Sequence, residues 1–136
     1  MEDKNVILDK LASDEFIKFI SKFNIFSVVI LGSICNEEFN ELSDVDIALL
    51  GKNKIPLDNI LDIELFLERF LERQIDVVDL RSHTLDLFIK INILNNGDVI
   101  YSTDNNKLFE RFCYETDRIY RENENFMYFR RADVLS

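Results

Sequence analysis

Three short apolar runs restrict this chain to folds built around a small β-sheet. Residues 26–31 (FSVVIL), 45–50 (VDIALL) and 75–80 (IDVVDL) are rich in β-branched side chains and are too short for buried helices. Gly32 and Gly51 end the first two runs, in a chain that has only three glycines and one proline. We therefore expect three strands, and residues 99–101 indicate a short fourth one.

Helical patterns occupy the intervals between these runs. The expected helical segments are 3–23, 58–73, 85–96 and about 105–136. Their expected capping or starting residues are Ser13, Asp58, Thr84 and Asp104. Gly97 follows the third segment in the position that favours a positive φ. The alternation predicts an α/β (α+β) fold, in which one small mixed sheet is flanked by helices.

The length and the net charge of the chain limit the number of domains and the kinds of partner that we expect. The chain has 136 residues, 47% of them hydrophobic, which favours a single domain over residues 1–136. Its 16 basic and 26 acidic residues give a net charge of −10, which argues against general binding to duplex nucleic acid. No early cationic segment precedes an apolar run, and no run is long enough to span a bilayer, so we expect a cytoplasmic protein without a membrane partner.

Cysteine and histidine, two common metal ligands, are scarce in this chain. Cys35 and Cys113 form no C-x-x-C pattern, which argues against a structural zinc site or a disulfide framework. His83 is the only histidine, and we expect it at the surface or near a helix start. A calcium loop of the EF-hand type and a Walker-type phosphate loop are excluded because their sequence patterns are missing.

Three aspartates are the strongest candidates for chemistry. Asp44 and Asp46 are two residues apart at the start of a strand, so their side chains point to the same face. Asp76 opens the next strand and can lie beside them. Two like charges about 4 Å apart repel by about 1 kcal/mol in water, and a divalent cation removes that repulsion. Oxygen ligands of this kind suit Mg²⁺ or Mn²⁺.

Asp79 is a rival for the third carboxylate. It has the opposite parity to Asp76 in the same strand, so it should point to the other face of the sheet. We expect a structural role for Asp79 and a site role for Asp76.

Gly32 and Ser33 are candidates for phosphate binding. They follow a strand directly, and a glycine there lets backbone N–H groups approach a ligand closely. Taken alone, the pair is also typical of an ordinary turn that ends a strand. Taken together, Gly-Ser, ten residues, Asp-x-Asp and a third Asp 30 residues later form the layout expected for metal-assisted attack on a nucleotide phosphoryl group.

The segment LGSICNEEFNELSDVDIALL resembles the signature of the polymerase β-like nucleotidyltransferase superfamily. The short chain and the segments QIDVVDL and LNNGDVIYSTD are similar to the minimal nucleotidyltransferases, antitoxins of HEPN/MNT pairs. The resemblance implies that Gly32, Ser33 and Ser43 bind the nucleotide. It implies that Asp44, Asp46 and Asp76 are catalytic and hold Mg²⁺, and that Asp76 also takes the proton of the attacking hydroxyl.

The same resemblance implies an activity and a partner. The family transfers a nucleoside monophosphate, often AMP from ATP. In toxin–antitoxin pairs the acceptor can be a tyrosine of a helical HEPN RNase toxin, so the resemblance implies a HEPN partner and a hetero-oligomer. The C-terminal helix, about 105–136, would then serve partner contact.

One departure from the family pattern leaves other interpretations open. Ile34, Cys35, Asn36 and Glu37 stand where members carry an aromatic residue, a small residue, Arg and Gly. A binding-only antitoxin that neutralises a basic partner is therefore an alternative. A nucleotidyltransferase that modifies small molecules is another, although about 35 C-terminal residues are few for an acceptor domain.

Overall fold

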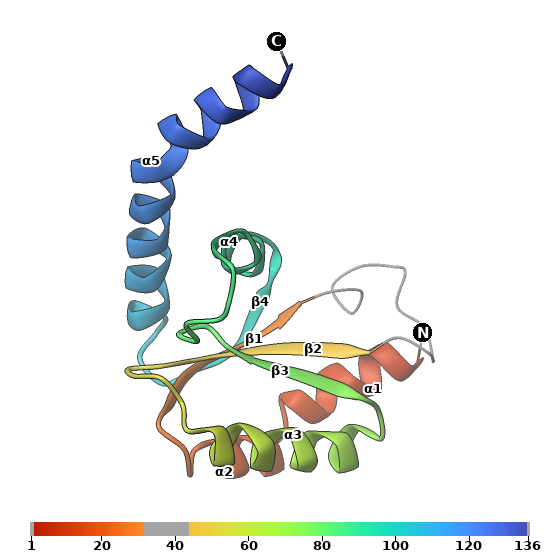
Figure 1. The fold of residues 1–136 in the computed structure, drawn as a ribbon. Helices are drawn as coiled ribbons and strands as arrows, with labels where there is room; N and C mark the ends of the chain where they lie inside the picture. Colours follow the sequence, from red (N-terminus) through yellow and green to blue (C-terminus); the bar gives the residue numbers. More distant parts are fainter. Residues whose placement is uncertain (1, 32–43, 136) are drawn as a thin grey trace.

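The structure of the chain is a computed structural model that describes residues 2–31 and 44–135, with side chains described for 4–31 and 44–122. Helices and strands alternate along these residues (Figure 1). In chain order they are α1 (Glu2–Leu11), α2 (Asp14–Ile20), β1 (Ile25–Leu31), β2 (Val45–Gly51), α3 (Leu57–Leu71), β3 (Ile75–Asp79), α4 (Leu87–Asn96), β4 (Asp98–Ser102) and α5 (Lys107–Leu135).

The four strands form one mixed sheet in the order β3-β2-β1-β4. β2 pairs in parallel with β3, whereas β1 is antiparallel to both β2 and β4. The prediction of a small mixed sheet flanked by helices is confirmed, and the short fourth strand is present at one edge. β3 occupies the opposite edge, so only one of its sides is paired with another strand of the described chain.

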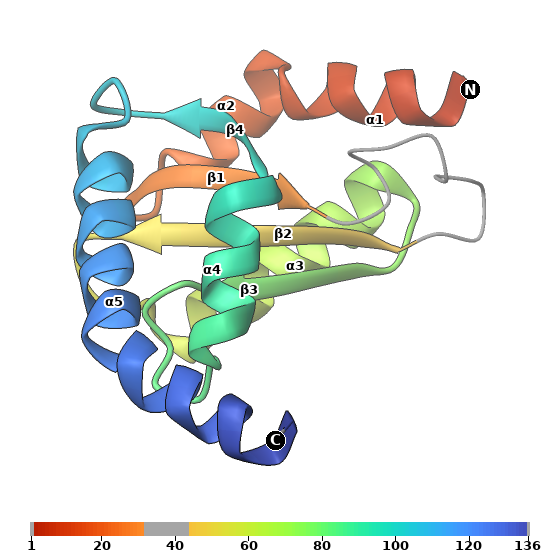
Figure 2. The same cartoon turned by 90° about the horizontal axis from the view of Figure 1, so that it is seen from above.

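Helices cover both faces of the sheet, as Figures 1 and 2 show. α1, α2 and α3 pack on one face through a core that includes Ile47 and Leu49 of β2. α4 and the first half of α5 pack on the other face against Ala48 and Leu50. Successive residues of β2 therefore point to opposite layers, and both layers are apolar. This two-sided burial explains why the strand reads as an almost continuous apolar run.

Two of the expected helix starts are confirmed. Ser13 is the N-cap of α2, where its hydroxyl accepts a hydrogen bond from the Phe16 amide. The carboxylate of Asp104 accepts from the Leu108 amide at 3.0 Å and so caps the first turn of α5. The segment predicted as 3–23 is divided by Ser13 into two helices, because a cap residue in extended conformation ends the helix before it.

The other two expected starts are wrong. Pro56 stands at the N-cap of α3, because proline is well suited to the start of a helix, and it makes no side-chain cap bond. Asp58 lies in the first turn of α3 and is not its cap. α4 begins at Leu87 with Asp86 as its cap, and Thr84 lies outside it. The Thr84 hydroxyl is instead hydrogen-bonded to that of Ser82 at 2.9 Å, in the preceding turn.

Gly97 has a role other than the one its position predicts. Its φ is −81°, so the expected positive φ is wrong. A Cβ atom at this position would lie 2.5 Å from Val29 Cγ1 and 2.7 Å from the Ile93 carbonyl oxygen. The glycine is required because α4 and β1 approach each other closely there.

Candidate functional site

Asp46 and Asp76 lie directly opposite each other in the parallel pair formed by β2 and β3. Both are near the starts of their strands, at the same end of the sheet. Neighbouring strands lie about 4.8 Å apart, so the two carboxylates share a small region of one sheet face. Asp46 is half-buried and Asp76 is exposed, so a ligand can reach the pair from solvent.

The pair is electrostatically unfavourable in the protein alone. Partial burial is the largest cause that raises the pKa of Asp46 above its ordinary value. The neighbouring Asp76 carboxylate raises that pKa further, and the charge of Asp44 adds to it. The fold therefore holds a carboxylate where negative charge is disfavoured, which is typical of a site that binds a cation or transfers a proton.

Asp44 precedes β2 and is exposed. Its effect on Asp46 places it in the same electrostatic neighbourhood, as the spacing predicts. Among residues 4–31 and 44–122, whose side chains are described, no three His, Cys, Asp or Glu side chains are arranged closely enough to hold one ion. A metal site shared by all three aspartates therefore stays a prediction, and the Asp46–Asp76 pair is the part of it that the structure brings together.

The carboxylate pair nevertheless fits a hard divalent cation. Its donors are oxygen atoms, and a negative charge that is disfavoured by its surroundings becomes favourable beside a cation. Mg²⁺ is commonly bound through one or two carboxylates, with waters and substrate phosphates as the remaining ligands. A third protein carboxylate is thus helpful but not required for such a site.

The predicted nucleotide-binding residues Gly32, Ser33 and Ser43 lie outside the described residues, as do Ile34 to Glu37. The strand that leads to Gly32 is described, and its last residue, Leu31, pairs with Asp46. The chain therefore leaves β1 beside the carboxylate pair. The pairing of Leu31 with Asp46 therefore supports a site in which the segment after β1 binds phosphate next to a metal held by the carboxylates.

Asp79 has the structural role that its parity predicts. It is buried, and its carboxylate accepts hydrogen bonds from the Ile55 amide at 2.8 Å and from the Arg81 amide at 2.9 Å. These contacts tie the end of β3 to the segment that leads into α3. Asp79 is therefore separate from the Asp46–Asp76 pair.

One acidic residue near the pair was not singled out from the sequence. Glu64 of α3 has its pKa raised, first by burial and then by the charges of Glu68 and Asp76. Glu64 and Glu68 are four residues apart, so they lie on one helix face, and that spacing was the available signal. Glu64 and Glu68 therefore extend the acidic region from Asp76 of β3 onto α3.

The remaining candidates show no site. His83 is exposed in the loop before α4, as expected. Cys113 is a free, half-buried thiol whose pKa is raised by burial and by Glu110, which disfavours a reactive thiolate. Within the part of the chain that the structure describes, no helix combines the length and the apolar character needed to cross a membrane.

Comparison with family models identifies one match that covers most of the chain. The model described as "Polymerase beta, Nucleotidyltransferase" matches residues 14–106. That range includes β1, β2 and β3, together with the motif residues Gly32, Asp46 and Asp76. No protein with a curated description matches the chain.

Solved structures show the same fold at low sequence identity. A toxin–antitoxin complex with AMP-PNP has a TM-score of 0.72 at 20% identity, over 90% of this chain and 98% of the matched chain. A tri-AMPylated HEPN toxin in complex with MNT antitoxin, from Shewanella oneidensis, has a TM-score of 0.69 at 18% identity, over 98% and 99%. A complex described as MntA-HepT has a TM-score of 0.67 at 20% identity, over 93% and 98%.

Proposed function

The chain belongs to the polymerase beta nucleotidyltransferase family, and we propose that it transfers AMP from ATP to a tyrosine of a HEPN toxin in the cytoplasm, as the antitoxin of the pair. The observation that carries the proposal is the Asp46–Asp76 pair beside the end of β1. It supports chemistry at a phosphate because the motif residues Gly32 and Ser33 follow β1 directly.

Asp44, Asp46 and Asp76 would hold Mg²⁺ or Mn²⁺, which supplies charge neutralisation for the phosphates when it is bound. Gly32, Ser33 and Ser43 would donate hydrogen bonds to phosphate oxygens and so orient the triphosphate. Asp76 is the more exposed carboxylate of the pair, so it is the better placed to accept the proton of an incoming hydroxyl. Most of the rate enhancement would come from positioning and charge stabilisation.

In the proposed reaction, the acceptor oxygen forms a bond to the α-phosphorus of ATP. The bond from that phosphorus to the oxygen bridging to the β-phosphate breaks, and pyrophosphate leaves. The hydroxyl proton passes to the Asp76 carboxylate. AMP thus becomes esterified to the acceptor, and no oxidant or reductant is needed.

Three observations support a nucleotide donor and a protein acceptor. Structures with the same fold include a complex with AMP-PNP and an AMPylated HEPN toxin bound to its antitoxin. The net charge of −10 suits association with a basic partner. The long helix α5 exposes Tyr114 to 70%, which fits the proposed use of the C-terminal helix in partner contact.

A binding-only antitoxin is the second candidate. Asn36 and Glu37 favour it, because they replace a basic residue and a glycine of the family motif. Loss of a positive charge near the triphosphate would weaken nucleotide binding. In that case the chain would neutralise its partner through complex formation alone.

A label-transfer assay separates the two candidates. The chain is co-expressed with the HEPN protein encoded by the neighbouring gene, and the complex is supplied with Mg²⁺ and ATP labelled at the α-phosphate. Label on the HEPN protein with wild type, but not with Asp46→Asn, supports transfer. Asp62→Asn is the matched control, since Asp62 is an exposed carboxylate on α3 beside Glu15 and Arg69.

Two outcomes would contradict the proposal, the first in its residues and the second in its reaction. Full labelling by Asp46→Asn would remove the proposed role of the carboxylate pair. A stable complex without label, together with neutralisation by the Asp44→Asn, Asp46→Asn, Asp76→Asn triple variant, would favour binding alone.

A further inference from the structure

The outer edge of β3 offers unpaired backbone groups next to Asp76. The Val45 amide donates to the Gln74 carbonyl, and the Leu80 amide donates to the Leu49 carbonyl. Even-numbered residues of β3 therefore direct their backbone groups toward β2. The backbone N–H and C=O of Val77 point the other way, toward an edge where no strand of the described chain pairs.

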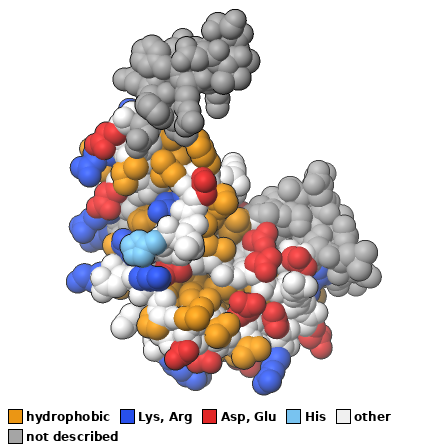
Figure 3. Space-filling view, viewed as in Figure 1, with side chains coloured by type: hydrophobic (Ala, Val, Ile, Leu, Met, Phe, Trp, Pro, Cys, Tyr) orange, Lys and Arg blue, Asp and Glu red, His pale blue; other side chains and the backbone are white. Residues whose placement is uncertain are grey.

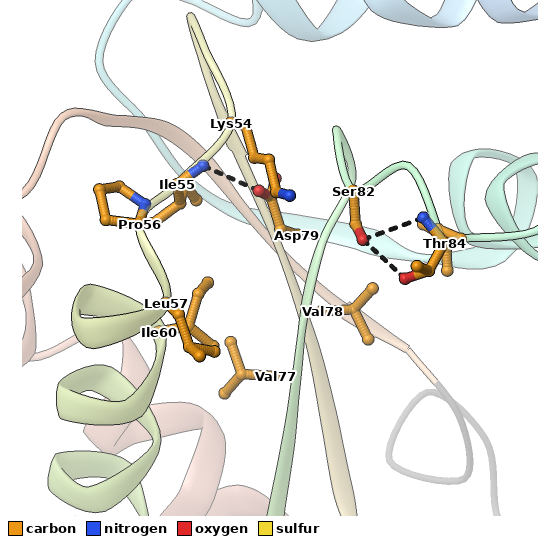
Figure 4. Close-up of a pocket in the computed structure, with 11 residues that line it drawn as sticks. Lys54, Ile55, Pro56, Leu57, Ile60, Val77, Val78, Asp79, Ser82 and Thr84 are labelled. Carbon is orange, nitrogen blue, oxygen red and sulfur yellow. Dashed lines mark hydrogen bonds between the residues drawn. The ribbon is translucent and has the colours of Figure 1, made fainter.

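A groove follows this edge on both sides of the strand (Figure 4). Its volume is about 670 Å³, and it is lined by Val77 and Val78 of β3, Leu57 and Ile60 of α3, and Leu85. Val77 and Val78 point to opposite sheet faces, so the groove wraps around the strand edge. Leu57 is 69% exposed, although it is a large apolar side chain. Such an apolar surface beside an unpaired strand is typical of a docking site.

The surroundings of the groove differ in charge between the two ends of β3. Lys54 lines the end beside Asp79. Asp76 precedes Val77 in β3 and lies just beyond the lining of the groove. Glu64 and Glu68 of α3 are close enough for the charges of Glu68 and Asp76 to act on Glu64. Figure 3 shows the apolar surface bordered by acidic side chains. An occupant that complements these charges has a basic side chain near Asp76.

We propose that this groove binds an extended segment of the protein acceptor, which adds to the free edge of β3 as a further strand and presents its hydroxyl opposite Asp76. This inference rests on the proposed function, and it specifies how the acceptor is recognised. The segment has apolar residues for the surface of Leu57 and Val77 and a basic residue at its Asp76 end. Recognition by added strands takes affinity from backbone hydrogen bonds and specificity from alternate side chains.

The same strand geometry would bring the acceptor hydroxyl close to Asp76. Side chains directly opposite on neighbouring strands have Cβ atoms about 5 Å apart. A hydroxyl-bearing side chain opposite Asp76 would therefore lie beside the carboxylate that takes its proton. The bonds made and broken are those of the proposed AMP transfer, with pyrophosphate as the leaving group.

A nucleic acid is a poor occupant of the same groove, because the end next to Asp76 is acidic. A second copy of this chain would bring a further charge of −10 to that region. An extended basic and apolar peptide satisfies both the backbone groups and the charges.

The test uses the complex with the neighbouring-gene HEPN protein and two pairs of variants. Val77→Pro removes the outward N–H, whereas Val77→Ala keeps it. Leu57→Lys places a charge in the groove, whereas Leu65→Lys makes the same change at a 54% exposed leucine of α3 outside it. Val77→Pro and Leu57→Lys should raise the KM for the HEPN protein about tenfold, as for the loss of one hydrogen bond or apolar contact. The Kd for ATP should not change, and the two control variants should match wild type.

Amide hydrogen exchange gives a readout that does not depend on catalysis. The Val77 amide should exchange at least about tenfold more slowly in the complex than in the free chain. If Val77→Pro fails to fold, the Leu57 and Leu65 variants and the exchange data still test whether the acceptor binds along β3.

Each failure has its own pattern. If wild type transfers label but the Val77 amide is not protected and Leu57→Lys behaves as Leu65→Lys, the docking mode is wrong and the proposed function stands. If the Val77 amide is protected but wild type transfers no label, the docking mode stands and the proposed function is wrong. Protection that depends on the concentration of the free chain alone would indicate self-association and overturn the proposal.

Discussion

Asp46 and Asp76 lie side by side on parallel strands, although 30 residues separate them in the chain. Burial and then the charge of Asp76 raise the pKa of Asp46. The two residues meet because α3 connects β2 to the parallel strand β3. The fold thus maintains two like charges at one end of the sheet, where folding alone gains nothing from them.

Asp46→Asn should abolish AMP transfer and leave the fold intact. We expect a loss of at least about a hundredfold in kcat, as for removal of a group that stabilises charge in the transition state. Circular dichroism of the variant should match wild type. A variant that retains more than half of the wild-type rate would contradict the role of Asp46.

The same variant should be as stable as wild type or more stable at neutral pH. The pKa of Asp46 is raised above 3.8, so the folded chain binds this proton more tightly than the unfolded chain does. The ionised carboxylate therefore costs stability above the folded pKa, and the cost disappears below 3.8. Urea unfolding of wild type and Asp46→Asn, at neutral pH and below pH 3.8, checks the sign of this difference in stability. A variant that is less stable than wild type only at neutral pH would show the opposite sign.

Mg²⁺ should stabilise wild type through the carboxylate pair. A ligand that binds only the folded state raises the free energy of unfolding by about 2.7 kcal/mol at one hundred times its Kd. The double variant Asp46→Asn, Asp76→Asn should lose this effect, whereas Asp62→Asn should keep it. Thermal unfolding with Mg²⁺ and with a chelator measures the difference, and equal shifts in all three proteins would place the ion elsewhere.

Asp79→Ala should destabilise the chain by about 2–3 kcal/mol, because it leaves the Ile55 and Arg81 amides without their acceptor. Asp79→Asn keeps one carbonyl acceptor and should cost less. Equilibrium unfolding in urea ranks the two variants. An Asp79→Ala protein with wild-type stability and no activity would instead give Asp79 a role in the reaction.

Gly97→Ala should destabilise by about 1–3 kcal/mol, as for overpacking in a core. The added Cβ would meet both Val29 Cγ1 and the Ile93 carbonyl oxygen. The double variant with Val29→Ala removes only the first of these clashes, so we expect partial rescue. Full rescue would show that the carbonyl oxygen is not a limit.

The prediction of strands succeeded where local pattern and burial agree. β1 and β2 are apolar on both faces, so their runs indicate strands whichever layer they meet. The helix start at Thr84 was wrong because more than one polar residue nearby can cap that helix, and the start at Asp58 was wrong because α3 begins without a side-chain cap. Pro56 precedes the first residue of α3, and Asp86 caps α4.

The sequence by itself determined the number of strands, the α/β class and the residue types of the candidate site, because periodicity and spacing are local properties of the chain. It also placed Asp79 on the opposite face from Asp76, since strand parity is local. Only the tertiary structure decided that β3 pairs with β2 in parallel, that Leu31 and Asp76 both flank Asp46, and that the outer edge of β3 is free. Strand order and register arise from contacts between residues distant in sequence, and the packing of helices on both faces of the sheet selects among them.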